Sequence, residues 1–363
     1  MPSQHALLSP SAAARWLNCP GSVSACADIK DKGSSYAAEG TEAHALAENV
    51  LNGVDLDTVA HMYNKDMVEN VQTYVDYVRS VGNPAVEQKL DMSDWIPECF
   101  GTSDAVVVRE KTINIIDLKY GKGIKVYAEK NPQLMIYGLG AWSEYEMLTD
   151  IENVVLHIVQ PRLDHIDTWE ISISSLLSWG EWVKDRAALA LSEDAPRFPG
   201  EAQCQWCKAK ATCKALYDYT SKIVGAQFDD MDALESPDKL SDRKLREVLE
   251  GSNVIKSWLD AVEKHVFNLM LDGKQFKGFK LVEGRSVRKW VDIDKTKVIL
   301  ENLLGDKAFE HKLLSPAKAE KALGKNKKAV ESLIIKPSGK PAMVPETDKR
   351  PKLENVEDQF GKL

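Results

Sequence analysis

Three features of the 363-residue sequence predict an α/β (α+β) protein with a central mixed sheet flanked by helices. Short β-branched runs follow one another between residues 85 and 118. Segments rich in Ala, Leu and Glu precede these runs and return after them. Two further β-rich runs come next, so the expected order is helix, three strands, helix, two strands and helix.

The first half of the chain is expected to begin with a loop-rich segment that reaches Tyr36. Two helices follow, one over AAEGTEAHALAENVLNG that stops at Gly53 and one over residues 66–81. The next three runs have strand composition: AVEQKL, SDAVVV and INIIDL. The second and third runs carry apolar residues on both faces, so we expect a sheet that is covered on both sides.

The second half of this region continues the alternation. NPQLMIYGLGAWSEYEML predicts a helix, because Asn131-Pro132 places a proline at the first helical position. Two strands are expected in NVVLHIVQ and DTWEIS, and a further helix in SSLLSWGEWVKDRAALAL. The polar stretch FDDMDALESPDKLSD then indicates a linker. We therefore expect two domains, residues 1–225 and a helical and mixed C-terminal region over 226–363.

The charge of the chain is unevenly distributed. The formal net charge is −8, yet residues 306–352 carry twelve Lys or Arg against six acids, 12 − 6 = +6. This basic tail is either a solvated surface or an arm that contacts phosphates.

Several classes of protein are excluded by composition. No apolar run approaches 18 residues, which argues against a membrane span. The N-terminus lacks a basic segment followed by an apolar one, so it does not have the pattern of a secretory signal. We expect a cytoplasmic protein. Six cysteines in a reducing compartment argue against a disulfide framework.

Two aspartates stand at the outer ends of the second and third β-rich runs. A hairpin centred on Glu110 and Lys111 pairs positions whose numbers sum to 221, which sets Asp104 opposite Asp117 with Cβ atoms about 5 Å apart. The period of two places Lys119 on the same face as Asp117. Two carboxylates this close repel each other unless one is protonated or a cation lies between them. Mg²⁺ or Mn²⁺ suits such ligands, and a surface acid pair bridged to Lys119 is the alternative.

Two further motifs accompany these acids. Gln133 and Tyr137 stand at i and i+4, so one helix face presents an amide and a phenol together. His44 lies in EGTEAH, on the first expected helix. By itself such a histidine is also found as an ordinary core or surface residue. Glu87 lies in the strand before Asp104 and is either a solvated strand-end residue or a group close to the site.

Taken in this order, EGTEAH, GTSD, IDLK and QLMIY resemble the motifs of the PD-(D/E)xK nuclease superfamily, in its RecB-like exonuclease branch. The likeness covers about residues 10–220. RWLNCPGS and DLKYGKG are also similar to a phage and prophage family that is often described only as a domain of unknown function. Many relatives have Glu where this chain has Asp117, and the shorter side chain changes the spacing around a metal.

The resemblance implies a restriction-endonuclease-like core and assigns roles to individual residues. It makes His44, Asp104 and Asp117 metal ligands, with the Leu118 carbonyl as an additional one. Lys119 becomes the catalytic lysine, and Gln133 and Tyr137 are expected to position the DNA backbone.

The function implied is that of a hydrolase, a Mg²⁺- or Mn²⁺-dependent DNA exonuclease that acts on DNA with a free end. A role in phage or prophage DNA recombination, with a single-strand annealing protein as partner, would follow, and a homo-oligomer is one state that the sequence allows. An endonuclease of the same fold is one alternative. The other is a noncatalytic DNA-binding or assembly protein that retains the fold.

Three cysteines form a second candidate metal site. Cys204, Cys207 and Cys213 have the spacing C-x2-C-x5-C, and Cys19 is the best candidate for a fourth ligand because Cys26 and Cys99 lack matching context. Four thiolates suit structural zinc and an iron-sulfur cluster equally well. The RecB-like branch includes members in which one Cys ahead of the core and three after it hold an iron-sulfur (4Fe-4S) cluster. The resemblance implies the same arrangement here.

Overall fold

The computed structural model describes residues 6–29, 35–225 and 241–279, together with the single residues 295, 298 and 302. The chain divides into two compact units, Met1–Asp272 and Gly273–Leu363. The expected boundary between residues 225 and 226 falls inside the first unit, which also contains helix α10 (Asp242–Leu271). The basic tail and most of the expected linker lie outside the described residues. The following description concerns the first unit.

A five-stranded mixed sheet forms the centre of this unit, with strand order β1-β2-β3-β4-β5. The strands are β1 (Ala85–Asp91), β2 (Phe100–Arg109), β3 (Thr112–Leu118), β4 (Asn153–Gln160) and β5 (His165–Ser172). Strands β3 and β4 run parallel and are connected through helix α6 (Pro132–Tyr145), whereas all other neighbours are antiparallel. The structure confirms the predicted α+β class and the predicted order of elements around the sheet.

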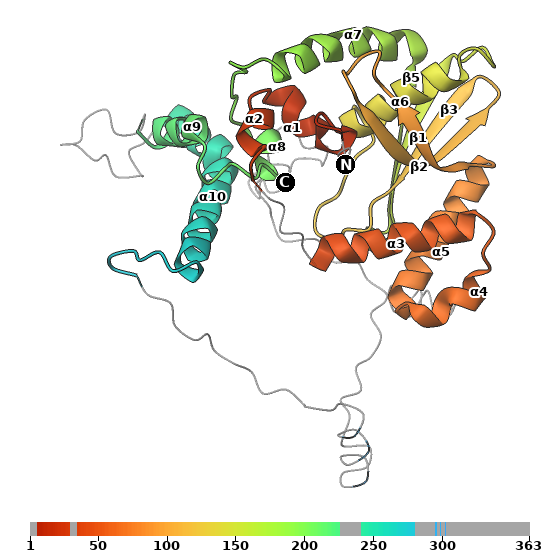
Figure 1. Ribbon diagram of the computed structural model, residues 1–363, viewed down its shortest axis with the longest axis horizontal. Helices are drawn as coiled ribbons and strands as arrows, with labels where there is room; N and C mark the ends of the chain where they lie inside the picture. The colour runs from red at the N-terminus through yellow and green to blue at the C-terminus, as the bar shows by residue number, and fades with distance from the viewer. Residues whose placement is uncertain are drawn as a thin grey trace, which may run out of the picture. The chain divides into compact units, whose positions relative to one another are not determined.

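Helices cover both faces of the sheet, with α6 and α7 (Ile173–Ala190) on one side and α3 (Ser35–Leu51) and α5 (Lys65–Val81) on the other (Figure 1). Alternate residues of β3 enter different cores: Ile115 packs with the α6 and α7 side, and Ile116 with the α3 and α5 side. This two-sided burial explains why β3 has a continuous apolar run instead of an alternating pattern.

Polar side chains define the starts of the long helices. Asn64 accepts a hydrogen bond from the Met67 amide at the start of α5. Asn131 accepts from two amides at the start of α6, and Ser172 accepts from one at the start of α7. Each cap satisfies backbone donors that have no partner within the helix. Among the described residues, no helix is both long enough and apolar enough to cross a membrane.

The N-terminal segment differs from the expected loop. It contains η1 (Pro10–Ala12), α1 (Ala13–Asn18) and α2 (Ser22–Cys26). Isolated helices this short are unstable in water, so their stability here comes from packing. Trp16 is fully buried and donates a hydrogen bond from Nε1 to the Ser9 carbonyl at 3.1 Å. Arg186 of α7 donates to the Leu17 carbonyl at 2.7 Å, which fixes the end of α1.

The remaining described elements are short, apart from one helix of twelve residues. They are α4 (Leu56–Val59), η2 (Ala60–Met62), η3 (Pro161–Leu163), α8 (Glu201–Gln205) and α9 (Lys214–Gly225).

Candidate functional site

The register of the β2–β3 hairpin is the one that the sequence predicts. Ala105 pairs with Ile116 at the outer end of the ladder, and all the pairs between the two strands have numbers that sum to 221. One step further along both strands places Asp104 opposite Asp117. The turn consists of Glu110 and Lys111, and Glu110 has a φ of 55°. A two-residue turn fixes the register and therefore the position of both aspartates.

The pairing of β1 with β2 adds a third acid to this row. Val86 pairs with Ala105 and Gln88 pairs with Ser103, so Glu87 lies opposite Asp104. Glu87 itself does not join the ladder, and its φ is 47°. Positive φ is uncommon for a residue other than glycine and costs free energy that the surrounding structure must supply. Three adjacent strands thus bring three carboxylates, those of Glu87, Asp104 and Asp117, to one level of the sheet.

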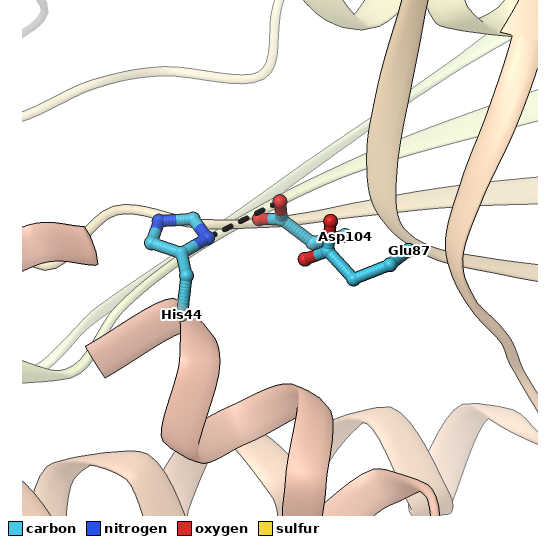
Figure 2. Close-up of side chains that lie close together, drawn as sticks. All are labelled: His44, Glu87 and Asp104. Carbon is cyan, nitrogen blue, oxygen red and sulfur yellow. Dashed lines mark ion pairs between the residues drawn. The ribbon is translucent and has the colours of Figure 1, made fainter. Parts of the chain in front are cut away.

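Helix α3 contributes an imidazole to the same place. Its buried residues recur at helical spacing and face the core, and these are Ala43, Leu46, Ala47 and Val50. His44 borders this apolar stripe and extends toward the carboxylates of Asp104 and Glu87 (Figure 2). His44 Nδ1 lies 3.2 Å from Asp104 Oδ1.

The imidazole and two of the carboxylates form a group that suits a divalent cation. One ligand atom from each of His44, Glu87 and Asp104 lies within 4.8 Å of the other two. Neighbouring ligands around an octahedral ion with bonds of about 2.1 Å are about 3 Å apart, close to the separation of His44 and Asp104. Carboxylates with one imidazole suit Mn²⁺ or Mg²⁺. The donor set is therefore compatible with a divalent cation.

Burial and the negative charges gathered in this group shift the pKa values of Glu87 and His44. Burial, and then the charges of Asp104 and Glu48, raise the pKa of Glu87 to about 7. Burial by itself lowers the pKa of His44, but the hydrogen bond and the negative charge of Asp104 outweigh it, and the pKa lies above its ordinary value. Each group is thus shifted toward its protonated form, as expected where negative charge accumulates.

A second group lies beside the first and contains the predicted lysine. Lys119 Nζ is 2.8 Å from Asp117 Oδ2 and donates a hydrogen bond to Gln133 Oε1 at 2.9 Å. Gln133 Nε2 in turn donates to Asp117 Oδ1 at 3.2 Å. Burial raises the pKa of Asp117. Burial lowers that of Lys119, but the charge of Asp117 outweighs it and raises the pKa overall. The three side chains form a closed ring of contacts.

Asp104 connects the two groups. Its Oδ1 faces His44, whereas its Oδ2 accepts a hydrogen bond from the Leu118 amide at 2.7 Å. A small pocket opens over this point. It is lined by His44, Ala47, Glu48, Leu51, Tyr74, Glu87, Asp104 and Leu118.

Tyr137 is buried one helical turn beyond Gln133, and 7% of it is exposed. Burial, and then the charge of Asp117, raise the pKa of its phenol. Gly101, the first residue of the GTSD motif, lies against this ring. A Cβ atom at Gly101 would come within 2.9 Å of Tyr137 Cε1, so the close approach of β2 to α6 requires glycine there.

The structure thus assembles the predicted residues in two groups. His44 and Asp104 belong to the cation-sized group, and Asp117, Lys119 and Gln133 to the adjacent ring. Glu87 was the weaker candidate in the sequence, yet it completes the first group. Its partnership with Asp104 follows from the β1–β2 register, which the sequence does not specify.

The four predicted cysteines line one pocket at the C-terminal end of α1. Cys19, Cys204, Cys207 and Cys213 all contribute to its wall. The Phe198 amide donates to Cys19 Sγ at 3.3 Å, and the Gly200 amide donates to Cys204 Sγ at 3.5 Å. Burial raises the pKa of Cys19 and Cys204. Within the described residues, no three of the cysteine sulfurs are all within 4.8 Å of one another.

The other two cysteines occupy different environments. Cys26 was set aside in the sequence, but its Sγ lies 3.7 Å from Cys207 Sγ, so it borders the pocket. No signal in the spacing of the cysteines indicated this contact. Cys99 is buried in the core, where its thiol donates to the Leu8 carbonyl at 3.3 Å.

Two comparisons relate this chain to known proteins. The model of the family described as "Protein of unknown function (DUF2800)" matches residues 5–351. The crystal structure of SSO0001 is similar over 57% of this chain and 85% of that chain, with 16% sequence identity and a TM-score of 0.27. A TM-score this low supports no conclusion about fold or function.

Proposed function

We propose that this protein, which belongs to the family described as a protein of unknown function (DUF2800), is a divalent-metal-dependent deoxyribonuclease with exonuclease activity. One observation carries the proposal. Three adjacent strands set Glu87, Asp104 and Asp117 in a row, with His44 against Asp104 and Lys119 paired with Asp117. Such a row of acids has little structural use, since it requires burial and mutual repulsion of like charges.

The chain's own residues supply distinct functions in phosphodiester hydrolysis. His44, Glu87 and Asp104 would hold Mg²⁺ or Mn²⁺, which supplies an activated water and stabilises negative charge on a phosphoryl oxygen. Lys119 contributes a second positive charge beside that position. Gln133 contacts both Lys119 and Asp117, so it fixes the direction of the lysine and acts as a positioning residue.

The choice of DNA and of exonuclease activity rests on the resemblance to RecB-like exonucleases. The motifs EGTEAH, GTSD, IDLK and QLMIY provide every side chain of the two groups except Glu87, in the order of that branch. A cytoplasmic role in phage or prophage recombination, beside a single-strand annealing protein, belongs to the same proposal.

We further propose that Cys19, Cys204, Cys207 and Cys213 hold an iron-sulfur cluster. Tetrahedral zinc with Zn–S bonds of about 2.3 Å requires sulfurs about 3.8 Å apart. Within the described residues no three of the cysteine sulfurs lie within 4.8 Å of one another, although Cys26 Sγ and Cys207 Sγ are 3.7 Å apart. The choice of an iron-sulfur cluster rests on the resemblance to the RecB-like branch, and structural zinc is the alternative.

The activity is tested with end-labelled linear DNA and closed circular DNA, each incubated with the purified protein and Mg²⁺ or Mn²⁺, and with a chelator as the control. Degradation of linear DNA alone supports the proposal. Nicking of circles would indicate an endonuclease of the same fold. Binding without cleavage of either substrate would indicate a noncatalytic DNA-binding protein and would overturn the proposal.

A further inference from the structure

The segment that connects Lys119 to Gln133 contains a positively charged loop. We use the name lysine loop for residues 120–127. It begins directly after Lys119, whose amide still donates to the Val159 carbonyl of β4 at 2.9 Å. It leads to Asn131, the cap of α6, and so to Gln133. Because Lys119 and Gln133 are hydrogen-bonded at 2.9 Å, the chain leaves the site and returns to it.

Two side chains of the sheet, the buried Gln160 and the half-buried His165, hold the backbone of this loop. Gln160 is 1% exposed, and its Nε2 donates to the carbonyls of Gly121 and Ile124, each at 2.8 Å. Its Oε1 accepts from the Val126 amide at 3.2 Å. His165 Nε2 donates to the Val126 carbonyl at 2.7 Å. The inward backbone groups of Gly121, Ile124 and Val126 are therefore satisfied, and these bonds fix the shape of the loop without a ligand.

Tyr120 is buried in the core, whereas the residues that follow it face solvent. All residues from 121 to 125 are exposed, including Lys122 and Lys125. Neither lysine forms an ion pair with any residue that the structure describes. Residues 120–127 contain two lysines and no acid, a charge of +2, in a chain of net charge −8. A preformed loop that carries unpaired positive charge is suited to bind an anion next to the site.

Two exposed apolar side chains lie between and beside these lysines. Ile124 is 52% exposed and Tyr127 is 53% exposed. The Tyr127 ring packs edge-on against His165, with centroids 5.3 Å apart. Alternating lysines and apolar groups match the chemistry of a nucleic-acid strand, in which phosphates alternate with sugars and bases.

We infer that the lysine loop binds the phosphate backbone of the nucleic-acid substrate, with Lys122 and Lys125 contacting phosphates beside the one to be cleaved. This inference rests on the proposed function and adds to it how the substrate is held. Contacts to phosphates carry no sequence information, so the binding is sequence-independent. Gln160 is a positioning residue for the loop, since its side chain forms three hydrogen bonds with the loop backbone.

The test compares DNA binding by two double variants, both made in the full-length chain that also carries Lys119→Ala to prevent cleavage. Lys122→Ala with Lys125→Ala is expected to weaken binding of a linear duplex about tenfold or more and to reduce the slope of log affinity against log salt by about 1.8. Lys122→Arg with Lys125→Arg should restore both values. Melting temperatures of all variants should agree, since the altered side chains are exposed.

The matched control is Lys184→Ala with Lys214→Ala, which removes the same charge from α7 and α9. These two lysines pair with Glu181 and Asp218. Their loss should leave the salt slope unchanged. An equal effect in the control would overturn the inference, because overall charge would then explain it. An unaltered slope in the loop variant, with DNA still cleaved by the unaltered protein, would overturn the inference alone. Absence of both binding and cleavage in the unaltered protein would overturn the proposed function as well.

Discussion

Lys119 Nζ lies 2.8 Å from Asp117 Oδ2, and only 6% of the Asp117 side chain is exposed. A buried charge of this kind must be paired, and the pair is completed by Gln133, which contacts both residues. The lysine is therefore held in one direction before any substrate arrives. Preorganised charge is the form of electrostatic stabilisation that enzymes use most effectively.

Replacement of Lys119 should reduce DNA cleavage but leave metal binding intact. Lys119→Ala is expected to reduce DNA cleavage by about 10²-fold or more, because one preorganised positive charge is lost. Mn²⁺ binding, measured by calorimetry, should be retained, since the lysine is outside the cation-sized group. Lys111→Ala, which alters an exposed lysine in the hairpin turn, is the control. Cleavage within about tenfold of the unaltered protein would show that Lys119 is not a catalytic residue.

The carboxylates should differ in their effect on metal affinity. Glu87→Gln and Asp104→Asn are each expected to weaken Mn²⁺ binding about tenfold or more, since both residues belong to the group with His44. Asp117→Asn should have a smaller effect on Mn²⁺ affinity, because the Asp117 oxygens contact Lys119 and Gln133. Calorimetry on the three variants measures this order. Equal losses for Asp104→Asn and Asp117→Asn would place Asp117 among the ligands, as the resemblance to RecB-like exonucleases implies.

The cysteine pocket yields a prediction that colour and metal content can check. Protein purified without oxygen should be brown and contain iron in preference to zinc. Cys19→Ser should remove the colour and lower the melting temperature, because Cys19 lines the pocket and joins distant parts of the chain. Cys99→Ser should retain the iron, since Cys99 lies in the core.

Cys26→Ser is the sharper comparison for this pocket. Cys26 borders Cys207 but does not line the pocket, so iron should remain in this variant. Loss of iron from Cys26→Ser but not from Cys19→Ser would show that Cys26, and not Cys19, is the fourth ligand of the cluster. Colourless protein with one zinc per chain would reject the iron-sulfur cluster and keep a thiolate site.

A buried histidine away from both sites should make stability depend on pH. Burial lowers the pKa of His157 to about 4, where its ring bonds Tyr77 and Asn114. The unfolded chain has the ordinary pKa of about 6.5, so between these values it binds more protons than the folded chain. Stability should therefore fall as pH decreases from about 6.5 to about 4, by up to about 3 kcal/mol.

Urea unfolding across this pH range measures the loss. The His157→Gln variant should show a flatter dependence, because glutamine does not titrate. An identical dependence in the variant would assign the effect to other groups.

The sequence was sufficient for the hairpin because its information is local. A two-residue turn and two apolar arms specify the register, which sets Asp104 opposite Asp117. The position of Glu87 depends on the pairing of β1 with β2, and no turn signal in the sequence fixes the register between those strands. The same holds for Cys26, whose contact with Cys207 joins residues 181 positions apart. The N-terminal helices were missed because their stability comes from the burial of Trp16 and not from helix propensity.

The attachment of α1 to late parts of the chain has a consequence for biosynthesis. Arg186 holds the end of α1, and the pocket that contains Cys19 is completed by Cys213. After Cys19 the ribosome adds 213 − 19 = 194 residues to reach Cys213, which takes about 10 to 40 s at about 5–20 residues per second. The helices on which α1 packs, α6, α7 and α8, are made one after another during that time, and until then its apolar side chains are available to chaperones. The N-terminal segment is thus the first part of the first unit to be made and among the last to be folded.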